Sequence, residues 1–245
     1  MKYITVCLLT LVFTVTSCKK SVEDKKLENN AESTTSTSDD AEWQLLFDGN
    51  SLDGWRGYNS TTLPDGWLVE DGLLKSLGKG GDMGGDIIYG VEKFSEFELQ
   101  LEWKIAEGGN SGVFYHVIED EKYGAPYYTG PEYQLLDQIG FPHKLEPWQS
   151  IGGDYGMYIP DYEGVVKKAG EWNSSKIIFT KDKVTYWLNE KETLSFIPWS
   201  EDWNKRKSEG KWKDFPDYGK AAEGYIGLQD HGSFIWFKNI KIKKL

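Results

Sequence analysis

Strict alternation of apolar and polar residues over 97–105 is the feature that most constrains how this chain can fold. In this segment, FELQLEWKI, every odd position is apolar and every even position is polar. Successive side chains of a β-strand point to opposite faces of its sheet. The segment therefore predicts an antiparallel strand with one face in a core and the other toward solvent.

Further segments with β character follow along the chain. They lie at 112–117, 132–138, 176–180, 183–188, 224–229 and 234–243. A hairpin is expected to turn at Lys181-Asp182, and the only helix expected is 200–208, with Ser200 as its N-cap. Many short strands in a chain with 27 Gly predict one all-β domain, a sandwich of antiparallel sheets.

The first 41 residues differ from the remainder and are set aside from the fold. Residues 1–17 combine a basic start with an apolar run that is too short to span a bilayer, which predicts a signal peptide. The run ends at Val-Thr-Ser before Cys18, which resembles a bacterial lipoprotein processing site. We expect lipid on Cys18, a disordered tether over 18–41, and a folded domain over 42–245. The alternative is ordinary signal cleavage near the same position.

Cysteine usage and charge limit the partners. Cys7 and Cys18 are the two cysteines, so the predicted domain has none and must be stable without disulfides. Removal of residues 1–17 takes away Lys2 and changes the net charge from −11 to −12. This excess of acid argues against nucleic acid and against a polybasic membrane patch. We expect a monomer held at the cell envelope by its lipid, facing the periplasm or the cell surface.

Several motifs in a fixed order resemble one known family. They are LFDGNSLDGW at 46–55, FELQLEW at 97–103, GNSGVFY at 109–115, EYQLLD at 132–137, GEWN at 170–173, GLQDHG at 227–232 and WFKNI at 236–240. Together they resemble the 3-keto-disaccharide hydrolase family, which was first catalogued as a domain of unknown function. One departure is His116, where the family often has Arg.

The resemblance implies a concanavalin A-like jelly-roll sandwich and action on sugars oxidised at C3. The ketone acidifies the hydrogen on C2, so a base can remove it and give an enolate. The C1 substituent then leaves with help from an acid, and water adds to the double bond. A base of this kind works best with a pKa near the ambient pH, and the enolate needs a positive or hydrogen-bonding group facing it.

The acidic segment 132–137 supplies the first candidates for this chemistry. In a regular strand Glu132 and Gln134 share one face and Asp137 points away from it. Glucanases of the implied fold carry a bulged acidic strand, and a β-bulge here would return Asp137 to the face of Glu132. We therefore predict Glu132 and Asp137 as catalytic acids and Gln134 as a substrate-binding residue. The alternative is an edge strand with solvated charges.

The other candidates come from turns, a strand and aromatic loops. His231, in a turn beside Asp230, is the third predicted catalytic residue and serves as base or electrophile. Predicted substrate-binding residues outside the acidic segment are Asn110 in a glycine turn, His116 in a strand, and Tyr155 and Trp148 in long loops, where binding residues concentrate.

No metal or cofactor is predicted, because the sequence lacks Cys pairs and His-Glu-x-x-His. A divalent ion could still stabilise the enediolate, and Glu132, Asp137 and His231 would then be the expected ligands. Two alternative functions stay open. One is a conventional retaining glycosidase, whose two carboxyls lie about 5–5.5 Å apart; the other is a lipid-anchored carbohydrate-binding protein without catalysis.

Overall fold

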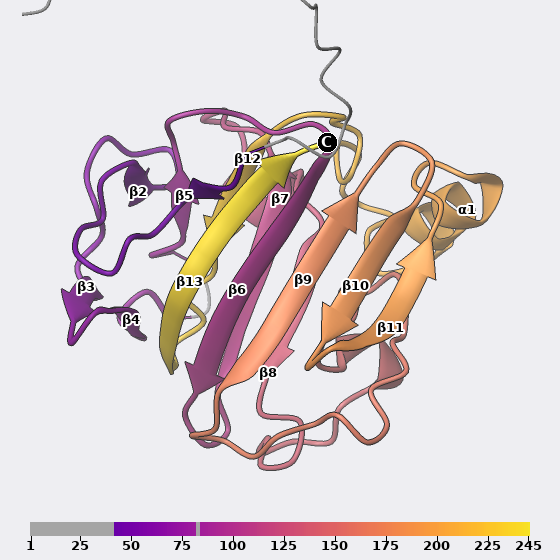
Figure 1. Cartoon of the computed structure of the whole chain (residues 1–245). Coiled ribbons are helices and arrows are strands. Elements are labelled where there is room, and N and C mark those ends of the chain that lie inside the picture. The colour runs from indigo at the N-terminus through magenta and orange to yellow at the C-terminus, as the bar shows by residue number, and fades with distance from the viewer. Residues whose placement is uncertain (1–41, 82–83) are drawn as a thin grey trace, which may run out of the picture. The chain divides into compact units, whose positions relative to one another are not determined.

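Two antiparallel sheets packed face to face make up the computed structural model, which describes residues 42–81 and 84–245. One sheet has eight strands and the other has five. In Figure 1 strands β13, β6, β9, β10 and β11 of the larger sheet lie in front of β7 and β8 of the smaller one. The all-β antiparallel sandwich predicted from the sequence is confirmed.

The eight-stranded sheet, called sheet A, has the order β11-β10-β9-β6-β13-β4-β3, with β1 pairing to β13 off this path. Its strands are β1 (Gln44–Leu45), β3 (Trp67–Glu70), β4 (Leu73–Leu77), β6 (Phe97–Ile105), β9 (Asn173–Phe179), β10 (Val184–Leu188), β11 (Lys191–Phe196) and β13 (Phe234–Lys244).

The five-stranded sheet, called sheet B, has the order β2-β5-β12-β7-β8. Its strands are β2 (Trp55–Gly57), β5 (Ile87–Tyr89), β12 (Tyr225–Leu228), β7 (Asn110–Val117) and β8 (Glu132–Leu136). The 3-10 turns η2 (Pro126–Tyr128) and η3 (Pro147–Gln149) lie in the long connection around β8.

Alternation places the core between the sheets. In β6 the burial pattern alternates along all nine residues, with Phe97, Leu99, Leu101, Trp103 and Ile105 buried. Burial of such a side chain contributes about 1.5–3 kcal/mol, so one strand gives the domain a large part of its stability. Its polar residues cover the outer face of sheet A.

The helix α1 (Glu201–Glu209) begins where the sequence predicts it. The Ser200 side chain accepts a hydrogen bond from the Trp203 N–H at 3.2 Å, as an N-cap does. Trp203 anchors the helix in the core, and its ring is stacked with that of Tyr218. The helix therefore holds the following segment, 210–218, against the sandwich.

Among residues 42–81 and 84–245, no helix is long and apolar enough to cross a membrane. The predicted signal peptide, the lipidation at Cys18 and the tether over 18–41 lie outside the described residues.

Candidate active site on the outer face of sheet B

The acidic strand β8 presents Glu132 and Gln134 on the outer face of sheet B. Its alternate residues Tyr133 and Leu135 are buried in the core between the sheets, and the Tyr133 hydroxyl donates to the Trp187 carbonyl at 2.9 Å. The intervening side chains therefore point away from the core. Glu132 and Gln134 are buried all the same, with relative exposures of 4% and 3%.

Strand register brings three further residues into line with Gln134. Gln134 pairs with Gly112 of β7, and the Gly112 carbonyl accepts the N–H of Gln229 at the end of β12. Since Leu228 pairs with Ile87, the same register places Gln229 beside Asp86, directly before β5. Strands lie about 4.8 Å apart, so this row spans roughly 14 Å from β8 to β5.

Gly112 leaves the space that the Glu132 carboxyl occupies. A Cβ at this position would lie 2.2 Å from Glu132 Oε1 and 2.8 Å from its Cδ. The Glu132 side chain therefore lies across the β7 backbone toward the middle of the row, which only glycine permits.

Burial strongly perturbs the Glu132 carboxyl. Loss of hydration raises its pKa well above the usual value, and the negative charges of Asp86 and Asp154 raise it further. The positive charge of Lys211 opposes this rise. Burial therefore favours the protonated form of the Glu132 carboxyl.

Asp86 is a second buried carboxyl on this face. Burial raises its pKa to about 7, and the nearby Asp230 carboxyl adds to the rise, while the Asp230 N–H, which it accepts at 2.9 Å, opposes it. A group with this pKa exchanges its proton near neutral pH. Sequence analysis missed Asp86, although an acid between Gly84-Gly85 and the apolar triplet 87–89 could have indicated a carboxyl at a strand entrance.

Lys211 supplies a positive charge at the Glu132 end of the site. Its Nζ lies 4.9 Å from the ring centroid of Tyr155, 5.5 Å from that of Trp148 and 5.4 Å from that of Trp212. The Trp212 indole donates to the Tyr155 carbonyl at 2.8 Å and ties 210–218 to the loop carrying Tyr155. The predicted binding residues Tyr155 and Trp148 thus lie together, with a lysine that no sequence pattern singled out.

Amide side chains line this face between β8 and β12. Gln134 Nε2 donates to Asn110 Oδ1 at 2.8 Å, so these two predicted binding residues contact each other. Gln229 Oε1 is buried without a donor among the residues that the structure describes. Buried acceptors of this kind usually find a partner, and a sugar hydroxyl is a suitable one.

Asp137 lies away from this group, so the predicted pair with Glu132 does not form. The β7–β8 register runs without a shift from Glu132 to Leu136, and the expected bulge in β8 is absent. The Asp137 carboxylate instead accepts the N–H groups of Gly108, Ile139 and Gly140 at 2.9–3.2 Å. These bonds close two turns, so the Asp137 carboxylate stabilises the local backbone.

His116 also departs from the expected position. Its backbone has φ 53, and the β7–β12 register shifts beside it, so the bulge of this sheet lies in β7. The inverted backbone turns the ring into the core, where it meets Phe97 and Phe179 edge to face and bonds the Ser95 carbonyl. Burial lowers its pKa to about 4. It cannot reach a sugar on the outer face, and the prediction of substrate binding is wrong.

His231 lies in the turn between β12 and β13, half-buried. The Asp230 carboxylate shapes this turn by accepting the N–H groups of Gly80 and Gly232. The backbone N–H of the preceding residue, Asp230, donates to Asp86. His231 therefore lies toward the β5 end of the row, whereas Glu132 lies at the β8 end. Its catalytic role stays a prediction.

Within the described part of the chain, no group of three His, Cys, Asp or Glu side chains is arranged to hold a metal ion. Glu132, Asp137 and His231, the expected ligands of a divalent ion, are not brought together as such a group.

The fold and this face define a β-sandwich with a polar, carboxyl-containing site that suits a carbohydrate. Residues 42–243 match the family model of the 3-keto-alpha-glucoside-1,2-lyase-like domain. The chain belongs to this family, and the membership predicted from the sequence motifs is confirmed.

Relatives of known sequence or structure agree with this placement. A 3-keto-disaccharide hydrolase of Bacteroides thetaiotaomicron is 36% identical over 225 residues, which cover 82% of this chain and 77% of the relative. The crystal structure of a predicted glycosyl hydrolase from Parabacteroides distasonis is 43% identical, with a TM-score of 0.77 over 83% of this chain and 94% of that one. A second such structure from the same strain is 28% identical, with a TM-score of 0.63 over 83% and 100%.

Proposed function

We propose that this chain hydrolyses 3-keto-glycosides by elimination and hydration on the outer face of sheet B. Family membership supports the substrate class. The observation that carries the mechanism is the presence of two buried carboxyls on one face, Glu132 and Asp86, whose pKa values are both raised by burial, that of Asp86 to about 7. Carboxyls whose pKa values are raised toward the ambient pH can serve as general acid and general base.

Asp86 is the base and Glu132 the acid in this proposal. Asp86, with a pKa of about 7, is partly ionised at neutral pH and takes the proton from C2. The electron pair of the C–H bond forms an enolate with the C3 ketone. The ketone then re-forms, a C1–C2 double bond appears, and the C1–O bond breaks. Glu132, whose protonated form burial favours, gives its proton to the departing oxygen.

Water completes the reaction. Its hydroxyl adds to C1 and a proton returns to C2, so the net change is hydrolysis of the glycosidic bond. Asp86, protonated in the first step, is positioned to return that proton, and Glu132, now ionised, can activate the water. Each carboxyl ends the cycle as it began.

Lys211 is proposed to stabilise the negative charge of the enolate. It is the cation whose charge acts on Glu132, and a preorganised positive group at a developing oxyanion can lower the barrier by several kcal/mol. Tyr155 and Trp148 hold the lysine from the side, and sugar C–H faces can pack on these rings. Gln134, Asn110 and Gln229 are proposed to bind hydroxyl groups.

The test offers the purified protein a 3-keto glucoside and its unoxidised parent, and follows aglycone release with and without a chelator. Release from the keto form alone, lost in Glu132→Gln and in Asp86→Asn, is the expected result. His231→Ala tests whether this histidine takes part in the reaction: activity is lost if it does and kept if it does not. Release from the unoxidised parent would instead indicate an ordinary glycosidase, and no release from either would favour a binding protein.

We also propose that the enzyme is a lipoprotein of the cell envelope, anchored through Cys18. The sequence of 1–18 supports this proposal. Metabolic labelling with a fatty acid, lost in Cys18→Ser, tests it.

A further inference from the structure

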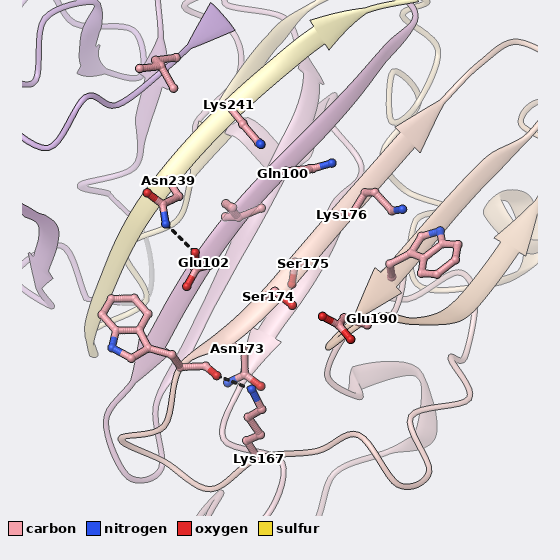
Figure 2. Close-up of a pocket in the computed structure, with 14 residues that line it drawn as sticks. Gln100, Glu102, Lys167, Asn173, Ser174, Ser175, Lys176, Glu190, Asn239 and Lys241 are labelled. Carbon is pink, nitrogen blue, oxygen red and sulfur yellow. Dashed lines mark hydrogen bonds between the residues drawn. The ribbon is translucent and has the colours of Figure 1, made fainter. Parts of the chain in front are cut away.

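The outer face of sheet A contains a groove on the other side of the sandwich from the proposed active site. Its volume is about 880 Å³, within the range of roughly 300–1,000 Å³ that ligand sites occupy. Figure 2 shows Gln100, Lys176 and Lys241 projecting from its floor, with Glu102 bonded to Asn239 nearby.

Register places these side chains in one row across four strands. Trp187 of β10 pairs with Lys176 of β9, which pairs with Gln100 of β6, which pairs with Lys241 of β13. Three strand spacings make this row roughly 14 Å long. The row therefore offers one indole, two ammonium groups and one amide along a line that a short chain ligand could follow.

Tryptophan and lysine are paired repeatedly on this face. Lys176 Nζ lies 3.9 Å from the ring centroid of Trp187, and Lys238 Nζ lies 4.3 Å from that of Trp172, which also lines the groove. The same pairing recurs at the margins, between Lys241 and Trp43 at 4.5 Å and between Lys104 and Trp236 at 4.7 Å. An ordinary solvated sheet face needs no such repetition.

The groove is more basic than the chain as a whole, whose formal net charge is −11, because three lysines (Lys167, Lys176 and Lys241) and two glutamates (Glu102 and Glu190) line it. Glu102 is neutralised by Lys238 at 3.2 Å, and Glu98 by Lys243 at 3.6 Å. Among the described residues, Lys176 and Lys241 form no ion pair, and their ammonium groups rest on indole rings. A ligand with negative groups can pair with these ammonium groups without displacing a protein carboxylate.

We propose that this groove binds an acidic oligosaccharide, with uronic acid or sulfate groups on Lys176 and Lys241 and sugar C–H faces on Trp187 and Trp172. The site is separate from the catalytic face and would hold a polymer near it, which raises the effective concentration of substrate. Its binding test does not depend on the proposed reaction.

Two other polyanions could use lysines and indoles. A single-stranded nucleic acid stacks its bases on aromatic rings, and an anionic membrane attracts lysines and interfacial tryptophans. The hollow form of the site argues against a flat bilayer. The excess of acid elsewhere on the chain argues against nucleic acid, whereas a family that acts on carbohydrate supports a glycan.

The experiment measures binding of the full chain to polygalacturonate and to the same polymer after reduction of its carboxyl groups. We expect binding to the acidic polymer, at least tenfold weaker binding to the reduced polymer, and weakening as salt is added. Trp187→Ala and Lys176→Gln should each weaken binding about tenfold. Lys205→Gln, on the exposed face of α1, is the matched control and should bind normally.

Two further measurements make the result decisive. Circular dichroism and activity on a small 3-keto glucoside should be unchanged in Trp187→Ala and Lys176→Gln, which shows that folding and the other face are intact. Equal binding to both polymers, or binding that neither variant alters, would overturn the proposal. So would tighter binding of oligodeoxythymidine or of phosphatidylglycerol vesicles, if the same variants abolish it.

Discussion

Replacement of Gly112 by alanine tests the role of Glu132 without changing that residue. The new Cβ would lie 2.2 Å from Glu132 Oε1, whereas ordinary contacts begin near 3.4 Å, so the carboxyl must move by about 1.2 Å. A misplacement of about 1 Å at a reacting group can lower the rate about 100-fold, which corresponds to about 2.7 kcal/mol in the barrier. We expect kcat/KM for a 3-keto glucoside to fall by this amount.

The fold should tolerate this change. Gly112 does not have a positive φ, and alanine in a strand is favoured over glycine by roughly 0.5–1 kcal/mol. Thermal unfolding should therefore move by only a few degrees. Gly227→Ala is the matched control on the neighbouring strand, because its Cβ would meet the Ile87 carbonyl at 3.2 Å and no catalytic side chain; we expect a loss below about threefold.

A double-mutant cycle shows whether the effect passes through Glu132. Glu132→Gln alone should remove most activity, and adding Gly112→Ala to it should cost nothing further. Near wild-type activity in Gly112→Ala, or full additivity of the two changes, would refute the placement of Glu132 as the acid.

Three other variants separate chemistry from structure. Because burial raises the pKa of Asp86 to about 7, the folded protein holds this proton more tightly than the unfolded chain. The free energy of unfolding should therefore fall by at most about 4 kcal/mol as pH rises from about 4 to about 7. Asp86→Asn should lack this loss in urea unfolding at pH 5 and pH 8, and an unchanged dependence on pH would contradict the prediction. Lys211→Met should lower kcat about 100-fold with a smaller effect on KM, and Lys211→Arg should restore part of kcat; a change confined to KM would leave Lys211 as a binding residue only. Asp137→Asn should lower the free energy of unfolding by about 1–3 kcal/mol, because a bonded backbone N–H loses its acceptor, with kcat of the folded enzyme preserved; a lost kcat would restore Asp137 as a catalytic candidate.

The longer strands could be predicted because burial repeats along them. Alternation over 97–105 gives the bounds of β6, and the hairpin at Lys181-Asp182 joins β9 to β10 as expected. The short strands β2, β3 and β5 have three or four residues each and show too few alternations to detect. They are positioned by their neighbours in the sheet, which is information that a single segment does not carry.

Half of the candidate site follows from local spacing and half from pairing between distant segments. Glu132 and Gln134 are two residues apart on one strand, so their common face could be predicted. Asp86 joins them only through the register of four strands, and Lys211 only through the anchoring of 210–218 by α1 and Trp212. No pattern within either segment encodes these contacts.

The two wrong expectations share one physical cause, the position of the bulge. The alternation of side chains along a strand predicts which face each residue lies on only while the register is unbroken. One extra residue moves every later side chain to the opposite face. A bulge in β8 would have placed Asp137 with Glu132; the observed bulge, in β7 at His116, turns that histidine into the core instead. Gly224 fits this geometry, since a Cβ there would lie 2.2 Å from the His116 carbonyl carbon. The left-handed backbone of one residue thus decides which face of sheet B the His116 ring lies on. Histidine is among the residue types found more often in that conformation, and it is held there by its bond to Ser95 and its contacts with Phe97 and Phe179.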